Sequence, residues 1–277
     1  MMSSSGNGKS PTGGSLDLAA LAIQAHGGTD RWNNVSHIEV SLNLTGSALE
    51  WKGYPGRLQP TCHINVRDTK VVFQGLGSGN QDDKWIFTPK RTWIERRDGT
   101  VLASRDNPYA NFLDHTRTTP WDDLDLACFA GYALHNYLTF PFHLLEPGFE
   151  YREVDSHEEN DETWRVLEVT FPDHHLAHSK IQLFYFDQDL MLRRVDYAPT
   201  AFKAPASHYC FDVKEISGLK IPTLRRVVSR MPNEPIVNGV HGLRGRTKLV
   251  GPTVFLLDYI HVVVHDEDSE TSVGVGI

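Results

Sequence analysis

The chain has 277 residues and a formal net charge of −8, and 40% of its residues are hydrophobic and 22% charged. This length and composition predict one large soluble domain with a substantial core, and the acidic balance argues against a nucleic-acid partner. No apolar run approaches the roughly 18 residues that a membrane span needs. We therefore do not expect a transmembrane helix.

The N-terminal region predicts a disordered tail followed by a short helix. Residues 1–14 are rich in Ser and Gly and lack the apolar stretch of a secretory signal. A helix is expected from Ser15, as its cap, to His26, with Gly27-Gly28 ending it in a left-handed conformation. We expect one β-barrel-like domain over 15–265, a helical insert at about 107–149, and an acidic C-terminal tail over 266–277.

The region from Val35 to Arg105 predicts antiparallel strands. Short segments rich in β-branched and aromatic residues alternate with Gly, Pro, Asn or Asp, and turns are expected at Arg67-Asp68 and Asp98-Gly99. Such spacing is typical of a sandwich or barrel. The expected strands lie near Ile38–Thr45, Ala48–Gly53, Arg57–Asp68, Lys70–Gly75, Lys84–Phe87 and Thr92–Arg97. No nucleotide-binding glycine motif is present, so no cofactor is expected.

The insert predicts a long helix and a lid. Acidic Asp122 and Asp123 suit a helix N-terminus, and the helix is expected to run to about Leu138. The following HNYLTFPFHLLEPGF is unusually apolar for a connection, so we expect it to cover one face of the sheet. Polar side chains embedded in such a lid can orient a ligand, and the candidates are His135, Asn136, Tyr137 and Phe142. The alternative is an ordinary helix end whose histidine binds the last carbonyls.

Strands are expected again after a polar loop at Asp155–Glu162. They are Trp164–Phe171, His208–Ile216, Leu224–Met231 and Phe255–His265. The Arg225-Arg226 pair is interpreted as a solvated strand edge.

The stretch from Ala177 to Tyr197 predicts a β-hairpin. Its arms are Ala177–Phe186 and Leu190–Tyr197, and a two-residue turn would pair Tyr185 with Leu192 and Leu183 with Arg194. Both faces of this hairpin are largely apolar, whereas a hairpin with one wet face alternates cleanly. We therefore expect both faces to be covered, one by core and one by a ligand cavity or helix.

The polar residues of this hairpin supply further candidates. His178 with Gln182 suits proton transfer with an orienting amide, and the alternative is a satisfied, half-buried histidine. Arg194 can pair with Asp196 or anchor a ligand carboxylate. His208 would meet His178 across the barrel if it points inward. The remaining candidates on this and the next strand are Phe184, Tyr185 and Tyr209.

The HHLAH segment raises the question of a metal site. Three imidazoles make a sufficient set of zinc ligands. On a strand, however, His174 and His178 would lie about 13 Å apart, too far to chelate together unless the segment turns or coils. No metal site is predicted, and His174 and His175 are expected to be exposed turn residues.

Several strings resemble a little-characterised group of bacterial and fungal proteins of about this length. They are AHGG…RW, GYALHNYLTFPFHLLEPGF, WRVLEVTFPDHHLAHSKIQLFYFDQDLMLRRVDY, SHY and PTLRRVVSR. The chain is more distantly similar to the outer-membrane lipoprotein carriers. That resemblance implies a half-open antiparallel barrel with helices lining an apolar cavity.

The sequence as a whole predicts a mainly β fold. We expect a curved antiparallel sheet or half-open barrel whose helix and lid cover an apolar cavity. The first functional hypothesis is a cofactor-independent cyclase, isomerase or lyase acting on a hydrophobic metabolite, as in secondary metabolism, with His178, His135, Tyr185 and His208 as catalytic candidates. The alternative is a non-catalytic carrier of a lipid or hydrophobic metabolite. The three cysteines have neither disulfide nor zinc spacing, so a reducing, cytoplasmic location is expected.

Overall fold

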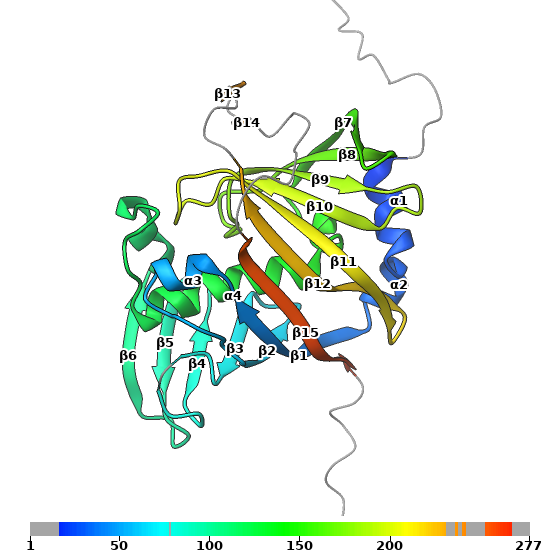
Figure 1. Ribbon diagram of the computed structural model, residues 1–277. Coiled ribbons are helices and arrows are strands. Elements are labelled where there is room, and N and C mark those ends of the chain that lie inside the picture. The colour runs from blue at the N-terminus through cyan, green and yellow to red at the C-terminus, as the bar shows by residue number, and fades with distance from the viewer. Residues whose placement is uncertain (1–16, 78, 231–235, 238–239, 242–252, 268–277) are drawn as a thin grey trace, which may run out of the picture.

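One curved antiparallel sheet of 13 strands forms the body of the protein. The computed structural model describes residues 17–77, 79–230, 236–237, 240–241 and 253–267. The sheet runs in the order β6-β5-β4-β3-β2-β1-β15-β12-β11-β10-β9-β8-β7 and curls around one long helix, α4 (Asp123–Thr139) (Figure 1). Its two edge strands are β6 and β7, which are not paired with each other. The predicted mainly β, half-open architecture is confirmed.

The last long strand, β15 (Thr253–Asp266), joins the two halves of the sheet. It pairs with β1 (Val35–Thr45) on one side and with β12 (Leu219–Ser229) on the other. The first half also contains β2 (Thr61–Asn65), β3 (Lys70–Gln74), β4 (Lys84–Phe87), β5 (Arg91–Glu95) and β6 (Val101–Asp106). The second half also contains β7 (Glu150–Glu159), β8 (Glu162–Thr170), β9 (Ile181–Phe186), β10 (Leu192–Tyr197) and β11 (Ala206–Ile216).

Short helices decorate this sheet. They are α1 (Leu18–Ala25), α2 (Gly28–Trp32), α3 (Ser47–Trp51) and the 3₁₀ helices Pro108–Asp114 and Phe142–Leu145, and a separate two-stranded ribbon pairs β13 (Ile236–Val237) with β14 (Val240–His241). Asp17 caps α1, and the expected cap Ser15 lies outside the described residues. Gly27 and Gly28 both have positive φ, as expected for the end of this helix. No helix in the described part of the chain has the length and apolar character to cross a membrane.

Two segments differ from the expected secondary structure. Ala48–Gly53, expected as a strand, lies mostly in α3, where Ala, Leu and Glu favour a helix and the Lys52 amide donates to the Ala48 carbonyl oxygen at 3.2 Å. Asp155–Glu162, expected as a polar loop, lies mostly within β7 and its turn into β8. As an edge strand, β7 tolerates charged side chains because they reach solvent.

The predicted hairpin is confirmed over β9 and β10, but residues 177–180 of its expected first arm, including His178, precede β9, and the expected register is wrong. The Asp187 carboxylate accepts hydrogen bonds from the amides of Asp189 and Met191, at 3.0 and 2.9 Å, and this builds a longer turn than expected. Tyr185 therefore pairs with Arg194 instead of Leu192, a shift of two residues that preserves most of the expected face assignments. Both faces of β9 and β10 are largely buried, as the sequence predicts.

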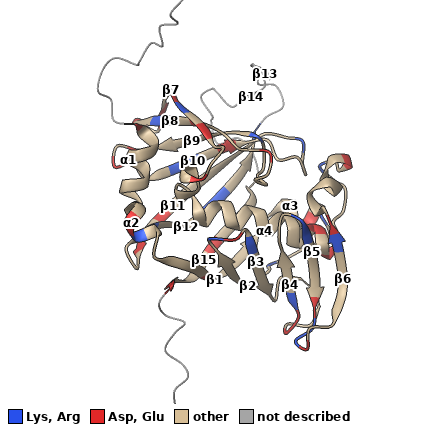
Figure 2. Cartoon of the chain, turned by 180° about the vertical axis from the view of Figure 1, so that it is seen from behind, with Lys and Arg blue, Asp and Glu red and all other residues tan. Residues whose placement is uncertain are grey.

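Helix α4 is buried on nearly all sides because the curled sheet surrounds it. Asp122 caps its N-terminus in a reciprocal arrangement with Asp125, and Arg105 forms ion pairs with both carboxylates. The charged residues within α4 are confined to its first turn, and the remainder is uncharged (Figure 2). We call the sheet face that packs on α4 the inner face, and the opposite one the outer face.

Gly131 allows α4 to lie directly on β4. A Cβ at this position would stand 2.3 to 2.6 Å from ring and Cβ atoms of Phe87. We expect Gly131→Ala to lower the free energy of unfolding by about 2 kcal/mol, since overpacking outweighs the gain in helix propensity. Urea unfolding measures this change. Phe87→Ala removes the Cγ and Cδ1 atoms that the new methyl group would meet, so additive losses in the double variant would contradict this contact.

Candidate functional site

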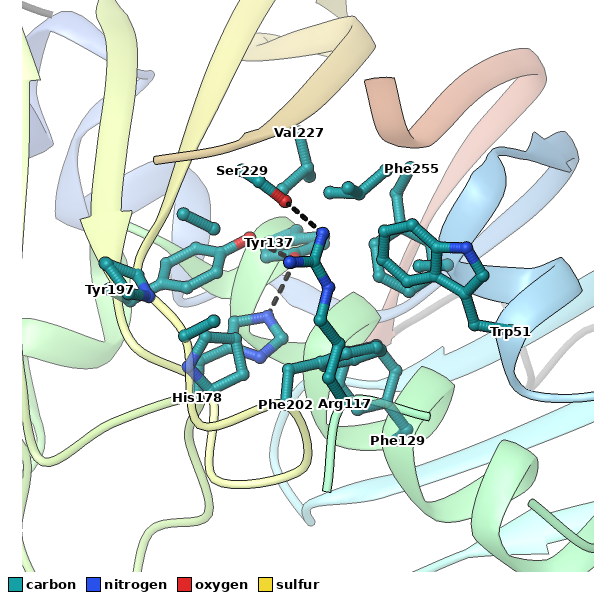
Figure 3. Close-up of a pocket in the computed structure, with 16 residues that line it drawn as sticks. Trp51, Arg117, Phe129, Tyr137, His178, Tyr197, Phe202, Val227, Ser229 and Phe255 are labelled. Carbon is teal, nitrogen blue, oxygen red and sulfur yellow. Dashed lines mark hydrogen bonds between the residues drawn. The ribbon is translucent and has the colours of Figure 1, made fainter. Parts of the chain in front are cut away.

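Three cavities meet at Tyr137, which projects from the C-terminal half of α4. The mouth cavity, of about 430 Å³ including its opening to solvent, lies under Trp51, Phe202 and the end of β12 (Figure 3). The apolar cavity, of about 490 Å³ including open solvent, lies between α3, α4, β1 and β15. The inner cavity, of about 320 Å³ including open solvent, lies between α4 and the inner face of β9, β10 and β12. Tyr137 lines all three, so the cavities are adjacent and share this side chain as part of their walls.

The walls of the mouth and apolar cavities are almost entirely hydrophobic. Phe129 of α4 and Phe255 of β15 line both cavities, and their rings stack with centroids 5.6 Å apart. Leu42, Leu134 and Leu257 complete the apolar cavity at its far end. Such walls favour an apolar ligand, because its burial removes hydrocarbon surface from water.

A chain of neutral hydrogen-bonding groups lies where the cavities meet. The Tyr137 hydroxyl lies 2.7 Å from His178 Nε2 and 3.2 Å from the Tyr197 hydroxyl, and Tyr197 continues to His208 Nδ1 at 3.3 Å. On the other side of the imidazole, the Tyr132 hydroxyl lies 3.3 Å from His178 Nδ1. Five residues from four segments of the chain are thus joined, and the Tyr137 and Tyr197 hydroxyls link His178 to His208.

Burial keeps this chain uncharged at neutral pH. Desolvation lowers the pKa of His178 to about 3 and places the pKa of His208 well below its ordinary value. It also raises the pKa of Tyr137 and of Tyr197 above the usual range. The site therefore offers hydrogen bonds, but no proton donor or acceptor that titrates near pH 7.

The loop between β8 and β9 places His178 in the site. The Asn136 side-chain amide donates to the carbonyl oxygens of Tyr132 and Leu176, both at 2.8 Å, and the Asn136 oxygen lies 2.7 Å from His175 Nε2. His175 is therefore packed against α4, which corrects the expectation that it is exposed, while His174 is exposed as expected. The three histidines of HHLAH thus lie in different environments: His174 is exposed, His175 packs against α4 and His178 lines the cavities. Within the described ranges, no group of three potential ligands is arranged to hold a metal ion.

Two basic residues that the sequence analysis did not single out shape the mouth. Arg117 lies over the Trp51 ring, with its guanidinium carbon 4.3 Å from the ring centroid, and donates to Ser229 Oγ at 3.4 Å. Lys52 is buried, and its ammonium donates to the carbonyl oxygens of Thr116, Thr119 and Ala201 at 2.9 to 3.3 Å. Lys52 thereby fixes the two loops that carry Arg117 and Phe202.

The predicted site residues separate into two groups. His178, Gln182, Phe184, Asn136 and Tyr137 line the cavities. His208 is joined to them through Tyr197. Two other candidates lie nearby without lining a cavity: His135 is buried beside His175, and Phe142 stacks on Trp32 with ring centroids 4.4 Å apart. The lid therefore contributes Phe140 and His143 to the inner cavity, while Phe142 anchors it on α2.

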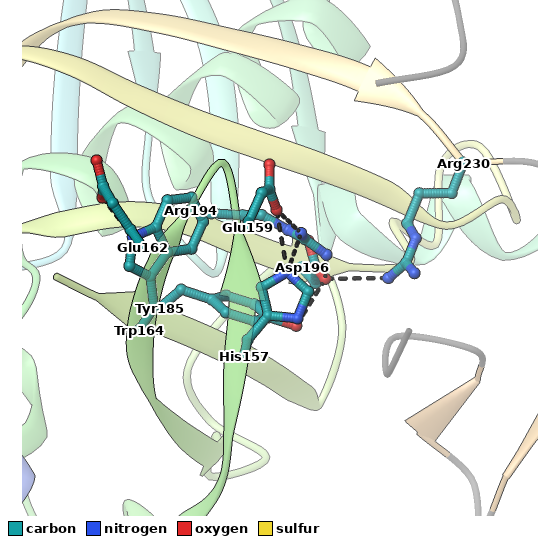
Figure 4. Close-up of polar contacts among 8 residues, drawn as sticks. All are labelled: His157, Glu159, Glu162, Trp164, Tyr185, Arg194, Asp196 and Arg230. Atoms are coloured by element: carbon teal, nitrogen blue, oxygen red, sulfur yellow. Dashed lines mark hydrogen bonds and ion pairs between the residues drawn. The ribbon is translucent and has the colours of Figure 1, made fainter. Parts of the chain in front are cut away.

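Tyr185, Arg194, Asp196 and Tyr209 lie on the outer face, away from the three cavities. Tyr185, Arg194 and Asp196 belong to a buried polar cluster with Glu159 and Arg230 (Figure 4), and the Tyr209 ring lies beside Arg194. Arg194 pairs with both Asp196 and Glu159, and the Tyr185 hydroxyl donates to Asp196 at 2.9 Å. Because side chains alternate along a strand, residues that neighbour Val195 and His208 in sequence necessarily face the other way. The structure thus favours the ion-pair alternative for Arg194.

Arg225 is a site residue that the sequence analysis placed wrongly. It lies on β12, between β11 and β15 at the centre of the sheet, and its side chain is buried and lines the inner cavity. The sequence string alone did not show that β12 is a central strand. The local alternation gives no signal either, because Leu224 with Arg226 and Arg225 with Val227 each combine an apolar residue with an arginine.

Comparison with known proteins gives matches among solved structures only. No protein-family model and no curated protein matches the chain. A LolA superfamily protein from Nitrosomonas europaea is 9% identical, with a TM-score of 0.49, covering 91% of this chain and 95% of that one. A DUF1329 family protein from Desulfovibrio piger is 12% identical, with a TM-score of 0.41 and coverages of 94% and 93%. A putative outer membrane lipoprotein-sorting protein domain from Vibrio parahaemolyticus is 8% identical, with a TM-score of 0.40 and coverages of 93% and 94%.

Proposed function

We propose that this protein binds a hydrophobic small molecule in the adjacent cavities around Tyr137 and carries it without converting it. The observation that supports this most directly is the meeting of three cavities at one side chain, two of them with almost wholly apolar walls. The polar groups at the junction, His178, Tyr137 and Tyr197, orient the ligand through hydrogen bonds. A cytoplasmic location is part of the proposal, supported by the three buried, free thiols.

The enzyme hypothesis is less well supported by the same geometry. A general acid or base works best with a pKa near the working pH, whereas burial lowers the pKa of His178 to about 3. His135 is buried with a pKa of about 4 and is not among the residues that line these three cavities, and Tyr185 lies on the outer face. The candidate catalytic residues are therefore not gathered around one reacting position.

Binding of the neutral fluorescent probe N-phenyl-1-naphthylamine tests the proposal. We expect a saturable rise in probe fluorescence with the wild-type protein. Ala206 lies at the mouth, so Ala206→Trp should fill the entrance and weaken probe binding by about tenfold, corresponding to the loss of a few ligand contacts.

The matched control is Ala103→Trp, which adds the same side chain at an exposed position on edge strand β6. It should leave probe binding unchanged. Equal binding by both variants, or no saturable binding by the wild type, would rule out a ligand in these cavities. Recovery of a chemically altered ligand after incubation would contradict the carrier role.

A further inference from the structure

Arg225 places a positive charge inside the protein. Arg225 is 1% exposed, and it pairs with Cys210 on the neighbouring strand β11 and with Leu257 on the neighbouring strand β15. The side chain points to the inner face and forms part of the wall of the inner cavity, together with Gln182 and Tyr137.

The contacts of Arg225 hold the guanidinium in place without neutralising it. One amino group donates to the backbone oxygen of Tyr137 at 3.0 Å and the other to Cys210 Sγ at 3.3 Å. The guanidinium carbon lies 5.2 Å from the centre of the Tyr137 ring and 5.7 Å from that of Tyr259. In the part of the chain that the structure describes, Arg225 Nε has no hydrogen-bond partner and no carboxylate pairs with the side chain.

Arg194 provides an internal comparison. It is as deeply buried as Arg225, but it forms ion pairs with Asp196 and Glu159. Buried charges in proteins are normally paired in this way, because an isolated one is strongly destabilising. Arg225 departs from that rule at the wall of a cavity.

The groups around Arg225 offset only part of its charge. Burial raises the pKa of the Cys210 thiol, so this sulfur is neutral at pH 7 and supplies no counter-charge. The carbonyl of Tyr137 belongs to the last turn of α4, and a helix C-terminus carries about half an elementary negative charge. The inner cavity therefore retains a net positive potential that suits an anion.

We propose that the inner cavity binds the acidic group of an amphiphilic ligand, a carboxylate, with Arg225 as its anchoring cation. This inference rests on the proposed function and specifies its ligand class. The apolar chain of the ligand then passes Tyr137 into the mouth or apolar cavity, where the aromatic walls bury it. The head group enters first and lies inside the protein, while Arg117 remains at the entrance.

Competition between a fatty acid and its alcohol tests this arrangement. Dodecanoic acid and 1-dodecanol, at pH 7.5 and below their aggregation concentrations, are used to displace N-phenyl-1-naphthylamine. The wild type should bind the acid about 10- to 100-fold more tightly than the alcohol, the range expected for a charge-assisted hydrogen bond. Arg225→Met should abolish this preference, and Arg225→Lys should keep part of it.

Arg117→Met distinguishes the two ends of the ligand. This variant should retain the preference for the acid, because the charge that it removes lies at the mouth, away from the proposed site of the carboxylate. Loss of the preference in Arg117→Met would place the head group at the entrance and overturn the proposal, as would equal affinities of the wild type for acid and alcohol. The acid and alcohol affinities of the wild type and of Arg117→Met test the proposal even if Arg225→Met does not fold. A bound probe that neither compound displaces would refute the ligand class proposed here, whereas the absence of saturable probe binding would refute the proposed function itself.

Discussion

Mild acid is expected to unfold this protein between about pH 5.5 and 4.5, because five histidines are buried in the neutral form. They are His26, His135, His143, His178 and His208, each at most 2% exposed. Burial lowers the pKa of His26 and of His135 to about 4 and that of His178 to about 3, and lowers those of the other two well below the usual value. At a pH between these lowered values and the ordinary pKa of histidine, the five imidazoles are therefore neutral in the folded chain and protonated in the unfolded chain.

The direction of the effect follows from proton binding. Between the ordinary histidine pKa of about 6.5 and the lowered values, the unfolded state binds more protons, so stability falls as the pH falls. Each histidine contributes up to about 1.4 kcal/mol per pH unit, and five together contribute at most about 7 kcal/mol per unit. A domain of this kind is typically stable by only about 5–15 kcal/mol. Carboxylates whose pKa is lowered in the folded state, such as Glu153 beside Arg165, cause a further loss of stability at a lower pH, where they become protonated.

Urea unfolding at a series of pH values measures the number of protons taken up on unfolding. His26→Phe removes one buried imidazole outside the cavities, so this number should fall by about one near pH 5. The matched control His174→Phe changes an exposed residue and should leave the number unchanged. An uptake of one proton or fewer by the wild type between pH 6 and 5 would contradict the expectation that these histidines remain neutral.

The sequence predicts the sheet and the hairpin because both depend on local patterns. Alternating apolar segments identify most strands, and acidic Asp122 identifies the start of α4. The register of β9 with β10 escapes this reasoning, since it is set by hydrogen bonds from the Asp187 carboxylate within the turn. The strand-like interpretation of Ala48–Gly53 fails because a short segment carries too little periodicity to separate a strand from a helical turn.

The candidate site was only partly predictable, because it depends on which strands are neighbours. His178, Gln182 and Tyr137 could be identified as polar residues within apolar surroundings, and they do line the cavities. Arg225 could not, since its burial follows from the insertion of β15 beside β12, a pairing between segments about thirty residues apart in sequence. Likewise, only the assembled sheet separates Arg194 on the outer face from Arg225 on the inner face.

The outer-face cluster leads to the second large effect, the loss of a buried counter-charge in Asp196→Asn. The Asp196 carboxylate is fully buried, accepts hydrogen bonds from Arg194 and Tyr185, and lies 3.0 Å from an amino group of Arg230. Asparagine keeps the shape but removes the negative charge, leaving two buried guanidinium groups less well compensated. We expect the free energy of unfolding to fall by about 3–5 kcal/mol, the usual result of removing one partner of a buried pair.

Two further variants separate the effect of charge from that of shape. Asp173→Asn makes the same chemical change in an exposed ion pair with Lys180 and should not measurably shift the urea midpoint. Removing Arg194 as well, in Arg194→Met/Asp196→Leu, should recover part of the stability lost in Asp196→Asn, because only one of the two guanidinium groups that pair with Asp196 then remains. A double variant less stable than Asp196→Asn would show that Arg194 contributes through contacts other than this ion pair. Probe binding should survive in every folded variant, since the sheet separates this cluster from the cavities on its inner face.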